Sequence, residues 1–168
     1  MKVKIKKLVD NAKVPTKVYD KDFCYDVYAT SCEEVEPGIW KYGIGLAFEI
    51  VREPTPWFGP CTGLLGDINL EQIVSHHSVN LSLDFRPRSS VWKTGMILSN
   101  CEGTLDELYR GEVMAYFYEV IPGKEKYKVG DRIGQIKLGF TLPIEFEVVD
   151  NLENTERGTG GFGSTGIN

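Results

Sequence analysis

Apolar and polar residues alternate at period two in separated segments of this chain, and this alternation restricts the folds open to it. Residues 2–6 carry an apolar side chain at every second position, and residues 79–86 repeat the pattern. Such alternation is typical of a strand with one buried face. Apolar or aromatic runs predict further strands at residues 44–51, 112–121, 133–138 and 144–149.

Turn residues separate these segments, and only residues 70–77 resemble a helix, with Asp67 or Asn69 as its cap. Strands of this length with turns between them predict an all-β sandwich or barrel. The 168 residues are the usual size of one domain, so we expect a single domain over residues 1–168. A proline-rich start opens an extra loop at about residues 54–78, and loops of this size are usually functional or disordered.

Charge and composition exclude several classes of function. The net charge of -5 leaves no basic footprint for nucleic acid, and no apolar run approaches the roughly 20 residues of a membrane span. The first ten residues lack the apolar core of a signal peptide, so we expect a cytoplasmic protein, or one of the host cytoplasm for a viral source. The four cysteines show neither CxxC nor zinc spacing and indicate reduced thiols, although a disulfide stays open. The adjacent pair His76 and His77 has no ligand partner at metal spacing and indicates a polar surface.

A glycine-rich segment at residues 156–166 surrounds Arg157, Phe162, Ser164 and Thr165. Backbone N–H groups of such segments approach anions closely, and an arginine adds a two-pronged phosphate donor. Phe162 offers a flat face for stacking on a base. A nucleotide-binding arm and a disordered tail are both compatible with this composition.

Three internal segments carry further polar groups. Residues 87–90 follow a predicted strand and hold Arg88 with two hydroxyls, which suits phosphate or a solvated turn. Residues 100–111 form a candidate hairpin in which Asn100 matches the imide edge of a base and Asp106 is a candidate general base. Because an aspartate pKa is near ~3.9, positioning and charge stabilisation would contribute most of the catalysis. Residues 130–135 hold Asp131 and Arg132, a candidate structural pair, and Gln135, whose amide suits a phosphate oxygen.

Together these segments resemble the five ordered motifs of the homotrimeric dUTP pyrophosphatases (dUTPases). The matching residues are YDVYA at 25–29, PRSS at 87–90, the stretch 100–111, GDRIGQ at 130–135 and the stretch 157–166. The resemblance spans nearly the whole chain apart from residues 54–78. It implies a jelly-roll-like β subunit, a C-terminal arm at residues 156–168, and a homotrimer whose active sites are shared between chains.

The resemblance also implies hydrolysis of dUTP to dUMP and pyrophosphate, with each role assigned by motif position. Asp106 would orient and deprotonate the water that attacks the α-phosphorus. Tyr109 would pack under the deoxyribose and exclude a 2′-hydroxyl, with Met114 close to the same pocket. Uracil would be read by Asn100 and by the backbone of Gly103, Thr104 and Leu105.

The phosphates and the metal take the remaining positions. The implied phosphate ligands are Arg88, Ser89, Ser90 and Gln135, and the implied arm residues are Arg157, Phe162, Gly163, Ser164 and Thr165. In the family, Mg²⁺ is held mainly by the triphosphate, and Asp26 would support the metal-bound waters.

Three positions depart from the family pattern. Cys24 and Leu108 stand where glycine and aspartate are usual, and Gly134 stands where alanine is usual. Leu108 raises the question of whether the missing aspartate supports subunit contacts.

Other functions stay open on the residues alone. The related dCTP deaminases need a glutamate where this chain has Tyr116, a poor substitute because its pKa is near ~10. Some phage-encoded dUTPases capture a regulatory protein with extra loops, and residues 54–78 are similar to such an addition. A structural jelly roll without catalysis is a further reading.

Overall fold

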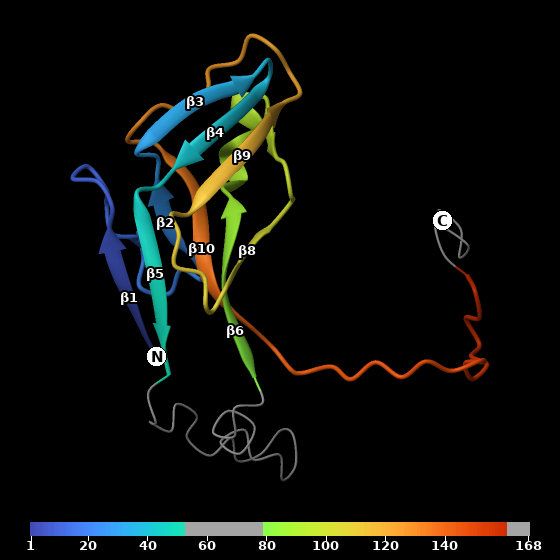
Figure 1. Cartoon of the computed structure of the whole chain (residues 1–168). Coiled ribbons are helices and arrows are strands. Elements are labelled where there is room, and N and C mark those ends of the chain that lie inside the picture. Colours follow the sequence, from blue (N-terminus) through green and yellow to red (C-terminus); the bar gives the residue numbers. More distant parts are fainter. Residues whose placement is uncertain (53–78, 161–168) are drawn as a thin grey trace.

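The computed structural model describes residues 1–52 and 79–160, and Figure 1 shows their arrangement. These residues form antiparallel sheets and one short 3₁₀ helix, η1 (Ser89–Thr94). The strands are β1 (Lys2–Lys7), β2 (Tyr25–Tyr28), β3 (Ser31–Glu36), β4 (Ile39–Gly43), β5 (Leu46–Val51), β6 (Asn80–Pro87), β7 (Met96–Leu98), β8 (Gly103–Asp106), β9 (Met114–Glu119) and β10 (Arg132–Thr141).

Two four-stranded sheets form the body of the subunit. Their strand orders are β2-β10-β6-β8 and β3-β4-β9-β7, while β1 and β5 form a two-stranded sheet of their own. β10 pairs with β2 on one side and with β6 on the other, and β8 lies at the edge beyond β6. Because β8 and β9 belong to different sheets, residues 107–113 pass from one sheet to the other.

The hydrophobic core takes side chains from all three sheets. Its largest fully buried members include Tyr42 and Phe117, which pack edge-to-face with ring centroids 5.6 Å apart. Tyr127 completes this aromatic group, 6.1 Å from Tyr42 and 6.0 Å from Phe117. Edge-to-face pairs of this kind add to the stabilisation that burial alone provides.

The all-β prediction is confirmed. The alternating and apolar segments at residues 2–6, 44–51, 79–86, 112–121 and 133–138 all contain strands, with ends that differ by a few residues. In β6, for example, Leu81, Leu83 and Phe85 face the core, as the alternation indicates. Among the described residues there is no helix with the length and apolar character that a bilayer span requires.

The predicted strand at residues 144–149 is wrong. Residues 142–149 form no strand, and Figure 1 shows the chain beyond β10 running away from the body of the subunit. Ile144, Phe146 and Val148 keep the alternation, yet they are 69%, 88% and 99% exposed. Period two shows only that a segment has one apolar face; a strand also needs a neighbour, and the described residues supply none here. The predicted helix at 70–77 and the extra loop at 54–78 lie outside the described residues.

Candidate active site

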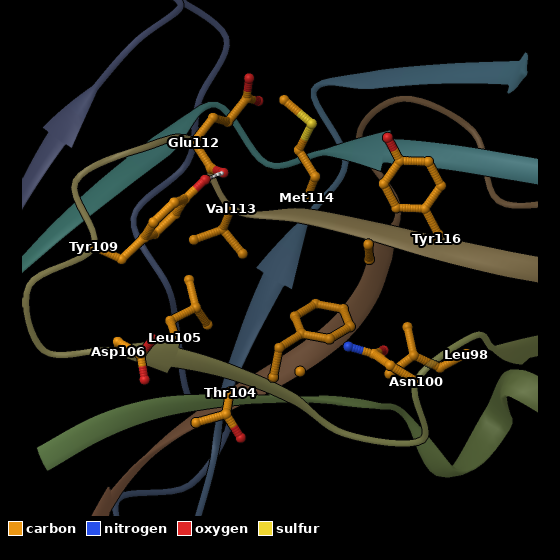
Figure 2. Close-up of a pocket in the computed structure, with 13 residues that line it drawn as sticks. Leu98, Asn100, Thr104, Leu105, Asp106, Tyr109, Glu112, Val113, Met114 and Tyr116 are labelled. Atoms are coloured by element: carbon orange, nitrogen blue, oxygen red, sulfur yellow. Dashed lines mark hydrogen bonds between the residues drawn. The ribbon is translucent and has the colours of Figure 1, made fainter.

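A pocket of about 370 Å³ opens between β8 and the start of β9, and Figure 2 shows its lining. Its volume falls in the range of small-molecule sites. Aromatic and aliphatic side chains form the walls, and a few polar groups are placed among them. The lining residues are Phe85, Leu98, Asn100, Gly103, Thr104, Leu105, Asp106, Tyr109, Glu112, Val113, Met114, Ala115 and Tyr116.

Pairing with β6 sets the position of β8 and of its polar side chains. Gly103 lies opposite Phe85, and Asp106 lies opposite Ser82. Within the described residues, no hydrogen bond or ion pair engages the side chain of Asn100 or of Asp106. An amide and a carboxylate therefore stand available to a ligand in one pocket.

Tyr109 forms a wall of the pocket because its ring folds back over the turn that follows β8. Its backbone N–H donates to the carbonyl of Asp106 at 2.9 Å, and its hydroxyl donates to the carbonyl of Glu112 at 3.0 Å. A Cβ at Gly111 would overlap the phenol ring, so only glycine leaves room for this arrangement. Hydrogen bonds hold both the backbone and the hydroxyl of Tyr109, so its ring is suited to a steric role.

A second polar cluster gathers around Asp26 on β2. Its Oδ1 accepts from Gln135 Nε2 at 3.1 Å and faces Arg88 Nε at 3.2 Å, while Oδ2 accepts from Arg132 Nη1 at 3.0 Å. Asp26 is only 5% exposed, so its charge requires these partners. A carboxylate has about four lone-pair sites, so the three partners leave room for one more donor, such as a water. The predicted pairing of Arg132 with Asp131 is wrong, because Arg132 pairs with Asp26 and Asp131 instead accepts from the Lys128 N–H at 2.7 Å.

Sheet order separates this Asp26 cluster from the pocket. Gln135 of β10 lies between Asp26 and Arg86, whereas the pocket lies at the far edge of the same sheet, on β8. Arg88 precedes η1, and Ser89 and Ser90 begin it. None of these three residues lines the pocket, nor does Gln135. One chain thus brings the predicted base and sugar ligands together but leaves the predicted phosphate ligands elsewhere.

Of the predicted arm ligands, only Arg157 lies within the described residues. Arg157 Nε donates to the carbonyl of Gly160 at 3.0 Å, in the segment that runs away from the body. Phe162, Gly163, Ser164 and Thr165 lie outside the described residues, so their predicted roles stay predictions.

Residues 100–111 do not form the predicted hairpin, since β8 pairs with β6 and not with a strand from the same segment. The reason is that the chain must cross to the second sheet to enter β9. Sequence reasoning also missed several pocket-lining residues: Phe85, Leu98, Glu112, Val113 and Ala115. It singles out Tyr116 only as standing where the related deaminases need a glutamate. The aromatic enrichment of residues 112–121 predicts a strand that contains Tyr116. It does not predict which end of that strand lines a cavity.

The structure explains one departure from the family pattern. A Cβ at Gly134 would overlap Cζ and Cε2 of Phe85 and would lie 2.9 Å from the carbonyl of Arg86. Glycine in place of alanine therefore makes room for a phenylalanine ring that lines the pocket. Leu108, by contrast, is 84% exposed and takes no part in the core.

Charged residues cover the sheet beside the pocket. Asp84 lies opposite both Lys137 and Thr104, and it accepts hydrogen bonds from Lys137 and Ser82. Burial raises the pKa of Asp84, but the hydrogen bonds from Lys137 and Ser82 outweigh it and hold that pKa below its usual value. Arg86 pairs with Glu102 at 2.5 Å, next to the turn that carries Asn100. The first pair joins β6 to β10, and the second joins β6 to the residue that precedes β8.

Comparison with known proteins identifies the family. A family model described as dUTPase matches residues 77–166. The deoxyuridine 5′-triphosphate nucleotidohydrolase of Nautilia profundicola is 32% identical over 168 residues and covers 99% of each chain. The Helicobacter pylori enzyme of the same name is 30% identical over 171 residues, 99% of this chain and 98% of its own.

The chain belongs to the dUTPase family. Solved dUTPase structures share its fold: that of Staphylococcus bacteriophage 80alpha with dUpNHpp has a TM-score of 0.68 at 20% identity and covers 99% of each chain. A variant dUTPase of phage phi11, described with a structural Mg(II) ion, has a TM-score of 0.61 at 15% identity, over 92% of this chain and 100% of its own. Within the described residues of the present dUTPase, no three His, Cys, Asp or Glu side chains gather as a metal site.

Proposed function

We propose that this protein hydrolyses dUTP to dUMP and pyrophosphate, which removes dUTP from the nucleotide pool and supplies dUMP. The observation that carries the proposal is the pocket of a dUTPase-family chain in which Asn100, Asp106 and Tyr109 line one cavity. An amide, a carboxylate and an aromatic wall correspond to the needs of base reading, water activation and sugar selection.

Recognition of the nucleoside rests on the walls of the pocket. The Asn100 amide donates and accepts at once, which matches the imide edge of uracil, and the backbone of Gly103, Thr104 and Leu105 adds further donors and acceptors. Tyr109, held by its hydrogen bond to Glu112, packs against the sugar where a ribose would place its 2′-hydroxyl. A wall held in place that leaves no room rejects the larger sugar by steric overlap.

Asp106 orients and deprotonates the water that attacks the α-phosphorus. Its carboxylate lines the pocket with no described partner to compete for it. Since an ordinary aspartate is a weak base at neutral pH, most of its effect comes from placing the water in line. Mg²⁺ bound by the triphosphate would polarise the phosphoryl oxygens, and Asp26 would accept a hydrogen bond from one of its waters.

A homotrimer accounts for the separation of the pocket from the Asp26 cluster. Arg88, Ser89, Ser90 and Gln135 do not line the pocket of their own chain. In a trimer with shared sites they serve the pocket of a neighbouring chain. The same assembly offers the exposed segment around Phe146 a neighbour, and it lets Arg157 and Phe162 close over a nucleotide.

Product analysis tests the proposal. The purified protein is incubated with Mg²⁺ and each of dUTP, dCTP, dTTP and UTP, and the products are separated by ion exchange. We expect dUMP and pyrophosphate from dUTP alone. Deaminated product from dCTP would instead favour the related deaminase, despite Tyr116 in the pocket where that chemistry needs a glutamate.

A regulatory role through residues 54–78 is a second proposal, compatible with catalysis. It is favoured by similarity to phage dUTPases that are described as controlling transfer of virulence genes, and as carrying a species-specific insert. Deletion of residues 54–78 should leave dUTP hydrolysis intact and abolish binding of a regulatory protein. Loss of hydrolysis on deletion would show that the segment serves the enzyme itself.

A further inference from the structure

Arg52 and Glu107 form a two-pronged ion pair beside the pocket. Arg52 Nε and Nη2 donate to the two carboxylate oxygens of Glu107, each at 2.6 Å. Arg52 Nη2 also donates to the carbonyl of Val79 at 2.7 Å. Arg52 follows β5, Val79 precedes β6, and Glu107 directly follows Asp106. One guanidinium therefore ties the ends of two strands to the residue next to the proposed catalytic carboxylate.

Glu107 begins the turn that carries Tyr109, and this turn is held together internally. Arg110 Nη1 donates to the carbonyls of Glu107 at 2.6 Å and Tyr109 at 3.0 Å, and the Tyr109 N–H donates to the carbonyl of Asp106. These hydrogen bonds link residues 106–110 into one unit. The Arg52 pair anchors this unit to the strands on which it rests.

The geometry of the pair favours a measurable contribution. Surface ion pairs contribute little, but two-pronged arginine–carboxylate pairs with limited exposure are the stronger class. The side chains of Arg52 and Glu107 are 35% and 23% exposed, against 57% and 44% for the single-contact pair of Lys4 and Glu49. Hydrogen bonding to Arg52 also holds the pKa of Glu107 below its usual value, so the pair stays charged at neutral pH.

We propose that Arg52 is a positioning residue: through Glu107 it sets the placement of the turn that carries Asp106 and Tyr109. The inference rests on the proposed dUTP hydrolysis, which gives those two residues their roles. Misplacing a reacting group by about 1 Å can cost up to ~100-fold in rate. Because Tyr109 moves with Asp106, loss of Arg52 affects sugar selection together with turnover, although Arg52 does not line the pocket.

The test uses Arg52→Met, Arg52→Lys, Glu107→Gln and the double variant of Arg52→Met with Glu107→Gln. The matched control is Glu119→Gln, which breaks the comparably buried pair of Lys126 and Glu119 (13% and 20% exposed) at the far end of β9. Steady-state rates are measured with dUTP and UTP for each full-length protein. Hydrogen exchange of residues 105–113 is followed in the absence of nucleotide.

We expect Arg52→Met to lower kcat/KM for dUTP by roughly 10- to 100-fold and to reduce the preference for dUTP over UTP. Arg52→Lys should recover part of the loss, and the double variant should be no slower than the slower single one, because the two side chains act as one unit. Exchange in residues 105–113 should become about tenfold faster, the factor that one charge-assisted hydrogen bond supplies. Glu119→Gln should change neither sugar preference nor this exchange.

Two results separate the inference from the function on which it rests. If wild-type protein makes dUMP but Arg52→Met keeps the wild-type rates and dUTP preference, the positioning role is overturned. If wild-type protein makes no dUMP, the proposed function has failed, and exchange in residues 105–113 alone decides whether Arg52 holds the turn. Unchanged exchange would then overturn the inference as well.

Discussion

Gly134→Ala should destabilise this protein, although alanine is the residue usual in the family and normally the better one within a strand. Gly134 lies in β10, opposite Val27 of β2 and Pro87 of β6. The added Cβ would overlap the ring of Phe85 and would lie 2.9 Å from the Arg86 carbonyl. Phe85 is 2% exposed, so its ring is packed on all sides except toward the pocket that it lines.

The expected loss in the free energy of unfolding follows from two opposing contributions. Overpacking a core costs about 1–3 kcal/mol, and replacing glycine with alanine returns about 0.4–1 kcal/mol of chain entropy, so the middle of each range gives a net loss of about 1.3 kcal/mol. At this chain length, that corresponds to a fall in Tm of roughly 3–5 °C. The KM for dUTP should also change, because the displaced ring lines the pocket.

Urea unfolding and calorimetry of wild type, Gly134→Ala and a matched control, Gly103→Ala, measure this effect. Gly103 lies in β8 of the same sheet, but its added Cβ would be 3.5 Å from Asn100 Nδ2 and 3.6 Å from Phe85 Cβ, which is ordinary contact. The control should therefore be neutral or slightly stabilised. Combining Gly134→Ala with Phe85→Leu should cost less than the sum of the two single changes. Equal unfolding midpoints for the two glycine variants would refute the argument.

Four further predictions concern the site and its surroundings. Asp106→Asn should retain binding of a non-hydrolysable dUTP analogue and lose about 100-fold or more in kcat; near-normal turnover would remove Asp106 as the base. Truncation before Arg157 should leave a folded protein with poor turnover, whereas full activity would show that the arm is dispensable. Tyr109→Ala should raise kcat/KM for UTP relative to dUTP, and an unchanged ratio would point to another steric wall. The lowered pKa of Asp84 confers stability that is present above its unfolded pKa, near ~3.9, and lost as pH falls below it, so Asp84→Asn should flatten the decline in unfolding free energy between pH 5 and pH 3.

Local pattern alone was enough to predict the motif residues and five of the ten described strands, namely β1, β5, β6, β9 and β10. It did not predict β2, β3, β4, β7 and β8. Alternation in residues 2–6 and 79–86 is a property of neighbouring positions, and a pleated strand converts it directly into a buried and an exposed face. The five short motifs likewise indicated the family from residue order alone, before any geometry was known.

Only the tertiary structure decided which of these residues meet. Asp26 joins Arg132 and Gln135 because β2 and β10 pair across more than a hundred residues of chain. It meets Arg88 because β6, which Arg88 follows, pairs with the other side of β10, and no local pattern encodes these registers. The same sheet order keeps that cluster away from the pocket at β8.

Residues 144–149 and Arg52 both show that local sequence does not determine long-range partners. The alternation at 144–149 predicts a strand, but no segment within residues 1–52 and 79–160 pairs with it. Arg52 has no motif around it, yet the fold places it 2.6 Å from Glu107 beside the proposed catalytic turn. Sequence therefore determined the faces and the chemistry of the segments, whereas long-range pairing determined their partners, because contacts between distant residues depend on how the whole chain packs.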